Sequence, residues 1–222
     1  MNLSSRFAPN ETIAEKLLPL VIEVSDDGSH DLSHILRVWR NVQLLREREG
    51  GDAAILTAAT LLHDYVDVPK TSPLRSSASR MAAEEATKIL TDLDWDQSRI
   101  QRVAHAIEAH SYSAGIKPVS LEAKILQDAD RLDAIGHIGV ARCFYVSGRL
   151  GRAIYDLENP DASNRDLDDA TYSVDHFYTK LLHLSETFQT ETGRKLGAER
   201  HKVTRDFLTG LLNEVSPEIS AS

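Results

Sequence analysis

The chain has very little cysteine and no long apolar run. Cys143 is the single cysteine among 222 residues, so no disulfide can form within the chain and a reducing compartment suits it. No apolar stretch reaches the roughly 18 residues of a membrane-spanning helix. Asn10, Glu11 and Glu15 interrupt the region in which a signal peptide would need continuous apolar residues. These absences predict a cytoplasmic protein without a membrane span.

Basic residues are also too few for a protein that coats nucleic acid or an anionic membrane. The sequence has 25 Lys and Arg against 34 Asp and Glu, a net charge of −9. This balance still permits a locally basic pocket for a small phosphorylated ligand. Apolar residues make up 41% and charged residues 27%, as in ordinary globular proteins. The length predicts a single domain over residues 1–222, and it also suits one domain with an appended helical lobe.

Alternation with period two is missing, so no strand is predicted. Apolar residues recur instead at spacings of three and four, which predicts an all-α architecture. The expected helices cover about 11–25, 31–49, 52–66, 77–91 and 96–110, and 120–148 forms one long helix or two that meet near Gly136. Residues 151–168 are expected to be an exposed connection, followed by two long amphipathic helices, about 170–191 and 194–214, around Gly193.

The expected helix over 52–66 is apolar on nearly all sides, which is typical of a central helix covered by its neighbours. It nevertheless ends in the adjacent pair His63 and Asp64. Isolated ionised groups are costly to bury, so this pair is expected to reach solvent, a partner or a metal ion.

Four residues are candidate metal ligands: His34, His63, Asp64 and Asp130. Two imidazoles and two carboxylates suit a divalent ion in octahedral geometry, with one or two positions left for water or a substrate oxygen. His63 and Asp64 can share an ion at a helix end, because adjacent residues are only about 100° apart around the axis. Asp128 competes with Asp130, but the two are about 200° apart on a helix, so only one can face the ion.

The order of these residues, in "HDLSHILRV", "LLHDYVDVPK" and "ILQDADRLDAIG", resembles the HD-domain metal-dependent phosphohydrolase superfamily. "AIEAHS", "HFYTKLLHL" and "TETGRKLGAER" are similar to one bacterial branch of small stand-alone HD hydrolases, and the likeness runs from about 25 to 205. It implies an HD-type helical bundle with a metal core over about 25–150 and a C-terminal helical part over about 168–214. It also implies one divalent ion (manganese, iron, cobalt, nickel or magnesium) on His34, His63, Asp64 and Asp130.

A proton-handling residue is expected beside the ion, and Asp67 is the candidate. It shares the face of His63 and Asp64 if their helix continues that far, and some family members use a carboxylate there as acid or base. The alternative for Asp67 is a helix-end or loop cap. Lys70 and Arg75, in the loop that follows, could bind a polyphosphate as cations or could be solvated loop charges.

Three further residues are candidates for contact with the substrate. His110 is expected to point into the pocket and to hydrogen-bond a phosphate or the attacking water. His105 lies about 140° away around the same helix, so it is expected to be structural rather than to share an ion. His176 and Lys180, in "DHFYTK", are expected to line the substrate pocket, or else to lie at the surface.

The family branch implies hydrolysis of a small nucleotide, a deoxynucleoside or nucleoside triphosphate, to a monophosphate and pyrophosphate. A nucleotidase and a phosphodiesterase are the enzymatic alternatives. Val66 and Asp67 occupy the positions of the Gly-Lys found in two-metal cyclic-dinucleotide enzymes, which counts against a phosphodiesterase. The alternative outside the enzymes is a non-catalytic ligand-sensing module, but relatives of that kind typically lose metal ligands, and all four are present here. Relatives are often dimers, so a homodimer is expected.

Overall fold

The computed structural model describes residues 2–24, 31–68, 72 and 74–216. Most of these residues are helical, and no strand is found among them, only an isolated bridge between Ala153 and Tyr172. The predicted all-α class is therefore confirmed. The chain divides into two compact units, Met1–Asp130 with Gln189–Gly193 (unit 1) and Arg131–Phe188 with Arg194–Ser222 (unit 2). The single domain over 1–222 stays a prediction.

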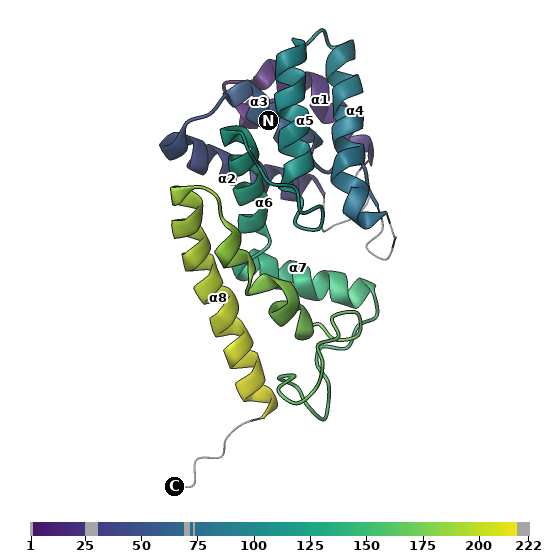
Figure 1. The fold of residues 1–222 in the computed structure, drawn as a ribbon, viewed down its shortest axis with the longest axis vertical. Helices are drawn as coiled ribbons and strands as arrows, with labels where there is room; N and C mark the ends of the chain where they lie inside the picture. The colour runs from purple at the N-terminus through teal and green to yellow at the C-terminus, as the bar shows by residue number, and fades with distance from the viewer. Residues whose placement is uncertain (1, 25–30, 69–71, 73, 217–222) are drawn as a thin grey trace. The chain divides into compact units, whose positions relative to one another are not determined.

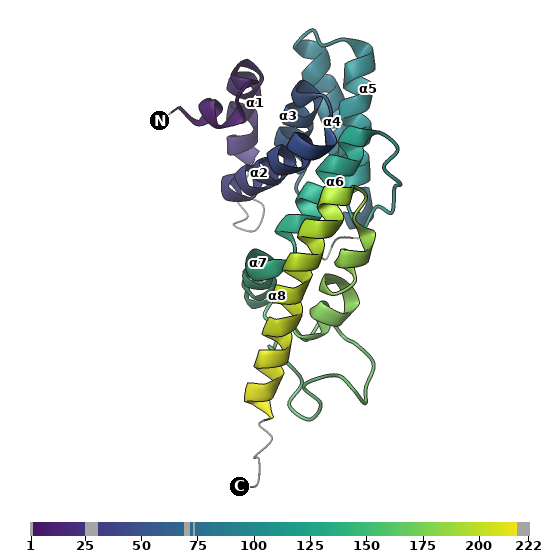
Figure 2. The same ribbon diagram turned by 90° about the vertical axis from the view of Figure 1, so that its left-hand side faces the viewer.

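Unit 1 is a helical bundle arranged around a central helix. Its α-helices are α1 (Glu11–Val24), α2 (Leu32–Glu49), α3 (Ala53–Leu62), α4 (Ala78–Asp92), α5 (Gln97–His110) and most of α6 (Leu121–Asp133). Helices α4 and α5 run side by side in both views (Figures 1 and 2). Helix α3 contacts α1, α2, α4 and α5, so it lies at the centre of the unit.

The burial of α3 follows from its composition. Every residue from 55 to 62 is buried, as expected for a helix that is apolar on all sides. Asp52 caps its N-terminus by accepting hydrogen bonds from the backbone N–H groups of Ala54 and Ile55 at 2.9 and 3.2 Å. The predicted central helix is confirmed, but it ends at Leu62, with His63 as its C-cap, rather than near residue 66.

Carboxylate caps also fix the starts of α2 and α5. The side chain of Asp31 accepts a hydrogen bond from the N–H of His34 at 3.1 Å, which places His34 in the first turn of α2. Asp96 caps α5 in the same way. Helix α2 ends at Gly50, whose φ of 87° is a backbone conformation that glycine adopts without strain. Two of the helices that carry chemistry therefore begin at residues set by local capping.

In unit 2 the regular helices are α7 (Gly136–Arg149) and most of α8 (Glu191–Val215). The predicted helix over 170–191 is wrong, because this region holds only a π-helical turn, Phe177–Leu181, and a 3-10 turn, Leu184–Thr187. Asp175, which is fully buried, accepts a bidentate hydrogen-bonded pair from Arg165 and a hydrogen bond from the N–H of Asp168 at 2.6 Å. This carboxylate holds the chain in a loop where amphipathic spacing predicted a helix.

The start of α8 is held within unit 1 by a buried carboxylate on α6. Asp128 accepts hydrogen bonds from the N–H groups of Gln189 and Thr190, both at 2.8 Å, and from the hydroxyl of Thr190 at 2.7 Å. Thr190 in turn caps α8, because its hydroxyl oxygen accepts from the N–H of Gly193 at 2.9 Å. Gly193 was predicted to separate two helices, but it lies inside the first turn of α8, where it packs directly against Asp128.

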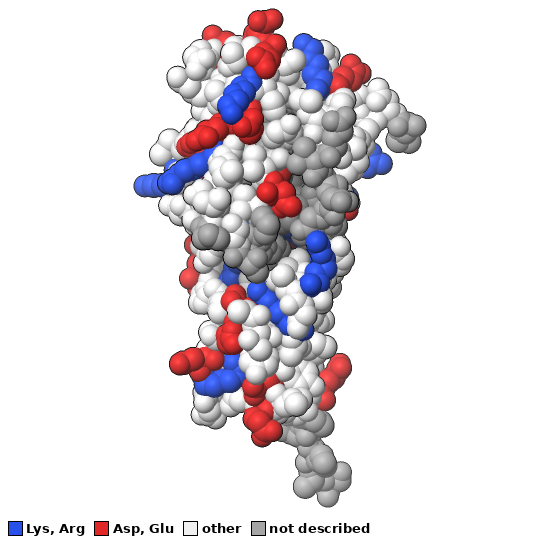
Figure 3. All heavy atoms as spheres, turned by 90° about the vertical axis from the view of Figure 1, so that its right-hand side faces the viewer, with Lys and Arg blue, Asp and Glu red and all other residues white. Residues whose placement is uncertain are grey.

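No described helix is both long enough and apolar enough to cross a membrane. On the face shown in Figure 3, Lys and Arg side chains are interspersed with Asp and Glu side chains. This face therefore lacks the extended basic surface that binding along a nucleic-acid backbone requires.

Candidate metal centre

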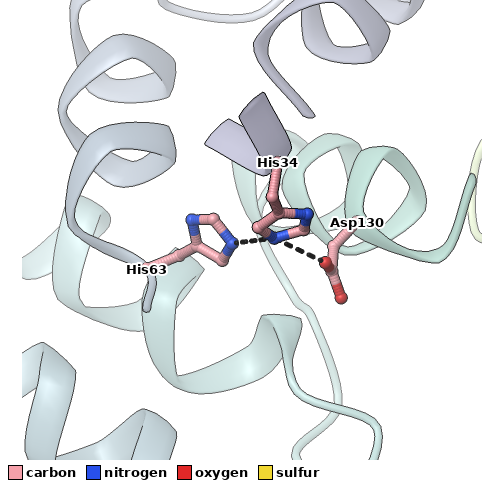
Figure 4. Close-up of side chains that lie close together, drawn as sticks. All are labelled: His34, His63 and Asp130. Atoms are coloured by element: carbon pink, nitrogen blue, oxygen red, sulfur yellow. Dashed lines mark hydrogen bonds and ion pairs between the residues drawn. The ribbon is translucent and has the colours of Figure 1, made fainter. Parts of the chain in front are cut away.

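Side chains from three separate segments of unit 1 meet at one point. His34 comes from the first turn of α2, His63 and Asp64 directly follow α3, and Asp130 lies in the last turn of α6. The Nε2 atoms of His34 and His63 are 3.2 Å apart, and Asp64 Oδ2 lies 3.6 and 3.5 Å from them. Asp130 Oδ1 lies 3.6 Å from His34 Nε2, and Figure 4 shows it directed at the same nitrogen.

The backbone fixes which nitrogen His63 presents to this point. His63 Nδ1 lies 2.8 Å from the carbonyl oxygen of Thr60. A carbonyl only accepts hydrogen bonds, so Nδ1 must carry the hydrogen, and Nε2 presents its lone pair to His34 and the carboxylates. This arrangement, with one ring nitrogen tied to the backbone and the other free to donate electrons, is typical of histidines that bind metals.

The distances from His34 Nε2 to the donor atoms of His63, Asp64 and Asp130 fit a single divalent ion. Two ligands that each lie about 2.1 Å from one ion are about 3.0 Å apart at a right angle and about 3.4 Å apart in a tetrahedron. The observed separations of 3.2 to 3.6 Å lie close to this range. His34, His63 and Asp130 each offer one donor atom within 4.8 Å of the others, as do His63, Asp64 and His110. The donor set and its spacing therefore suit a divalent metal.

The electrostatics favour the protonation states that bind metal. Burial lowers the pKa of His63 to about 4, more than the neighbouring carboxylates raise it, so this imidazole is neutral near pH 7. Burial works to raise the pKa of Asp130, but the neighbouring His34, His110 and His63 bring it below its ordinary value. A neutral imidazole and an ionised carboxylate are the forms that donate electron pairs to a divalent ion.

His110, the last residue of α5, is buried beside this group. Its Nε2 lies 3.6 Å from Asp64 Oδ1, and its Nδ1 donates to the carbonyl of Ile107 at 2.6 Å. Burial alone would lower the pKa of His110, but Asp64 and Asp130 raise it above the usual histidine value. His105 instead accepts a hydrogen bond from the N–H of Val119 at 3.1 Å, outside the donor group.

Comparison with known proteins identifies the family. An HD domain family model matches residues 31–135. The Bacillus subtilis protein YpgQ is 33% identical over 214 residues, which cover 94% of this chain and 96% of YpgQ. The crystal structure of an HD-superfamily hydrolase from Bacillus thuringiensis is 30% identical with a TM-score of 0.70, covering 94% of this chain and 98% of that one. The chain belongs to the HD-domain superfamily of metal-dependent phosphohydrolases.

A second solved structure matches at a similar level. The crystal structure of Bacillus subtilis YpgQ in complex with ADP has a TM-score of 0.70 and 32% identity, and the match covers 95% of this chain and 98% of that chain. HD domains bind divalent metal, and His63 and Asp64 form an adjacent His-Asp pair within the matched residues 31–135.

The structure also separates the two competing carboxylates of α6. Asp130 is turned toward His34, whereas Asp128 is fully buried and accepts hydrogen bonds from Gln189 and Thr190. The two residues face different directions, as their spacing of two along a helix requires.

Three predicted site residues, Asp67, Lys70 and Arg75, follow α3 in sequence and lie outside that helix. The helix ends at Leu62, so the argument that Asp67 shares a face with His63 does not hold, and Asp67 is exposed. Its catalytic role stays a prediction. Arg75 Nη1 donates to the carbonyl of Val68 at 3.0 Å, which ties the two ends of this loop together. Lys70 lies outside the described residues, and substrate contacts by Lys70 and Arg75 also stay predictions.

His176 and Lys180 lie in unit 2, at the π-helical turn Phe177–Leu181. Both are partly buried, and His176 Nδ1 lies 3.0 Å from Asp169 Oδ2. The contact of His176 and Lys180 with substrate stays a prediction. The pairing of His176 with Asp169 was not expected from the sequence.

Sequence reasoning missed the polar side chains that hold α6 in place. Asn41 on α2 donates to the carbonyl of Ala129 at 2.9 Å, and Gln127 donates to the carbonyl of Ala109 beside His110. Both side chains are buried, and together with Asp128 they fix the helix that carries Asp130. A signal for Asn41 exists in the sequence, because it lies three residues after Val38 on the apolar face of α2. A lone polar residue on such a face indicates a specific hydrogen bond.

Proposed function

We propose that this HD phosphohydrolase cleaves a nucleoside or deoxynucleoside triphosphate to a monophosphate and pyrophosphate. The observation that carries the proposal is the position of His34 Nε2, which lies 3.2 to 3.6 Å from the donor atoms of His63, Asp64 and Asp130. Such a donor set suits a divalent ion for phosphate chemistry. A nucleotide substrate is further supported by the crystal structure of YpgQ in complex with ADP. The choice of a triphosphate follows the likeness of this chain to small stand-alone HD hydrolases.

Each residue of the site then has a physical role. A divalent ion held by the four ligands would neutralise phosphate charge and lower the pKa of a water molecule bound to it. Asp64 is shared, since one carboxylate oxygen lies near the two ligand histidines and the other lies 3.6 Å from His110. His110 is thereby oriented beside the ligand group, with its Nε2 available to exchange a proton with a reacting oxygen. Phosphoryl transfer demands mainly alignment and charge stabilisation, which this arrangement supplies.

Product analysis distinguishes this proposal from the other HD activities. The purified chain is incubated with manganese and a panel of nucleoside mono-, di- and triphosphates, and products are identified by mass. We expect monophosphate and pyrophosphate in equal amounts from the first time point, without a diphosphate intermediate. Chelation of the metal should stop the reaction, and added manganese should restore it. Accumulation of a diphosphate, or phosphate release from monophosphates alone, would reject the triphosphate assignment.

His110→Gln tests whether this residue handles a proton or holds the metal. Glutamine keeps a polar side chain of similar reach but cannot exchange a proton near neutral pH. We expect kcat to fall by about 10²- to 10⁴-fold while the metal content of the protein is retained. Metal content by elemental analysis and kcat at saturating manganese measure the two effects separately. Loss of the metal together with activity would instead make His110 a ligand.

A further inference from the structure

Unit 2 contains a histidine that is oriented by a carboxylate. His176 Nδ1 lies 3.0 Å from Asp169 Oδ2, and the hydroxyl of Thr179 donates to the same oxygen at 2.8 Å. The pKa of Asp169 is lowered, since burial raises it less than the bonds from His176 and Thr179 lower it. An ionised carboxylate only accepts, so Nδ1 of His176 carries the hydrogen. Nε2 makes no hydrogen bond to any residue that the structure describes.

Two cations lie near this imidazole. Lys180 follows His176 by four residues along the π-helical turn. Arg152 is placed by the backbone, since the N–H of Ala153 donates to the carbonyl of Thr171 at 3.0 Å, beside the turn that carries Asp169. Burial, then Lys180 and Arg152, lower the pKa of His176, while Asp169 opposes them. The histidine therefore lies in the positive field of both side chains.

Arg152 differs from Arg142 and Arg165, two other arginines of unit 2, in its hydrogen bonding. Arg165 forms a bidentate pair with Asp175, and Arg142 lies 2.8 Å from Asp133 Oδ2. The Nε of Arg152 is buried and has no hydrogen-bond partner among the described residues. A buried donor without an acceptor is unfavourable unless a ligand or water supplies the acceptor.

We propose that Arg152, His176 and Lys180 form an anion-binding site in unit 2 for a phosphate or diphosphate group, with Asp169 as the residue that orients His176. A phosphate group offers several acceptor oxygens, so it can bind both cations and the imidazole at once. A bound anion opposes the field of the cations and favours the protonated imidazole, whose Nε2–H then becomes a third donor. The binding of a phosphate group at this site is independent of the proposed function. Only the further statement that this phosphate belongs to a nucleotide rests on the proposed function.

The test uses the full-length Asp64→Ala chain in EDTA, so that neither hydrolysis nor the predicted metal centre contributes. Inorganic pyrophosphate is titrated by calorimetry and by NMR of the His176 imidazole. We expect saturable binding, an upward shift in the pKa of His176, and affinity lowered about tenfold or more in Arg152→Gln, Lys180→Gln and His176→Gln. Matched controls are His183→Gln and Lys202→Gln, which change exposed residues of the same unit and should leave affinity unchanged.

Two results would overturn the site: no pyrophosphate binding to the unsubstituted chain or to Asp64→Ala, or affinity that is equal in the cluster variants and the controls. The NMR readout needs no cluster variant, so a substitution that fails to fold leaves the test intact.

A non-hydrolysable nucleoside triphosphate, titrated in parallel, identifies the source of the phosphate. Tighter binding of the nucleotide than of pyrophosphate assigns the site to the substrate, and equal binding assigns it to the free anion. If the chain hydrolyses nucleoside triphosphates but does not bind pyrophosphate, the anion-binding site is refuted and the proposed function stands. If it binds pyrophosphate but hydrolyses no nucleoside triphosphate, the proposed function is refuted and the site stands.

Discussion

Replacement of His63 or Asp64 by alanine is expected to remove the bound divalent ion and to reduce hydrolysis by more than about a hundredfold. Partners that merely orient metal ligands typically contribute about 10- to 100-fold to affinity or activity, so the loss of a ligand should exceed that range. His63 is almost fully buried and its Nε2 lies 3.2 Å from His34 Nε2, so no solvent-exposed group can replace it without rearrangement. Elemental analysis and initial rates at several manganese concentrations measure both effects.

His183→Ala is the matched control for His63→Ala, because it removes an exposed imidazole from unit 2. It should retain both metal and turnover. Circular dichroism of each variant separates metal loss from unfolding, since alanine at the buried position 63 also leaves a cavity. Full metal content with undiminished turnover in His63→Ala or Asp64→Ala would refute the assigned centre.

The central part of the fold follows from sequence because several signals there agree. The apolar residues of 55–62, the cap Asp52 and the adjacent His63 and Asp64 all indicate a buried helix that ends in a polar site. The predicted end of that helix was too late in the sequence, because "LLHDYV" contains no residue that strongly breaks a helix. The chain leaves the helix at Leu62, and the argument that placed Asp67 beside His63 fails with it.

The C-terminal part could not be predicted as well, because long-range contacts override its local pattern. The apolar residues over 170–191 do have the spacing of an amphipathic helix. However, Asp175 pairs with Arg165, ten residues earlier, and this pair holds the chain in a loop. Gly193 looked like a helix break, yet it is required by the contact with Asp128, which is 65 residues away in sequence. Neither contact has a local signal in the sequence.

Gly193→Ala is expected to destabilise the protein by about 3 kcal/mol or more. A Cβ at this position would overlap the carboxylate of Asp128 and would lie 2.8 Å from the hydroxyl oxygen of Thr190. Overpacking alone costs about 1–3 kcal/mol. A displaced Asp128 would also lose hydrogen bonds to a buried charge, each worth about 1.5–3 kcal/mol. Since Asp128 and Asp130 share α6, we expect weaker manganese binding in addition.

Gly210→Ala, in the same helix, is a control that is expected to raise the free energy of unfolding, whereas Gly193→Ala is expected to lower it. Nothing lies within 4 Å of a Cβ built at Gly210, which is an exposed position of α8. Alanine there should stabilise the helix by about 0.5–1 kcal/mol, because glycine loses more backbone entropy on folding. Denaturant unfolding followed by circular dichroism compares the two variants with the parent chain. If both variants shift stability equally, the contact with Asp128 does not restrict position 193. A large loss in Gly193→Ala alone would show that the contact with the buried Asp128 carboxylate restricts position 193 to glycine.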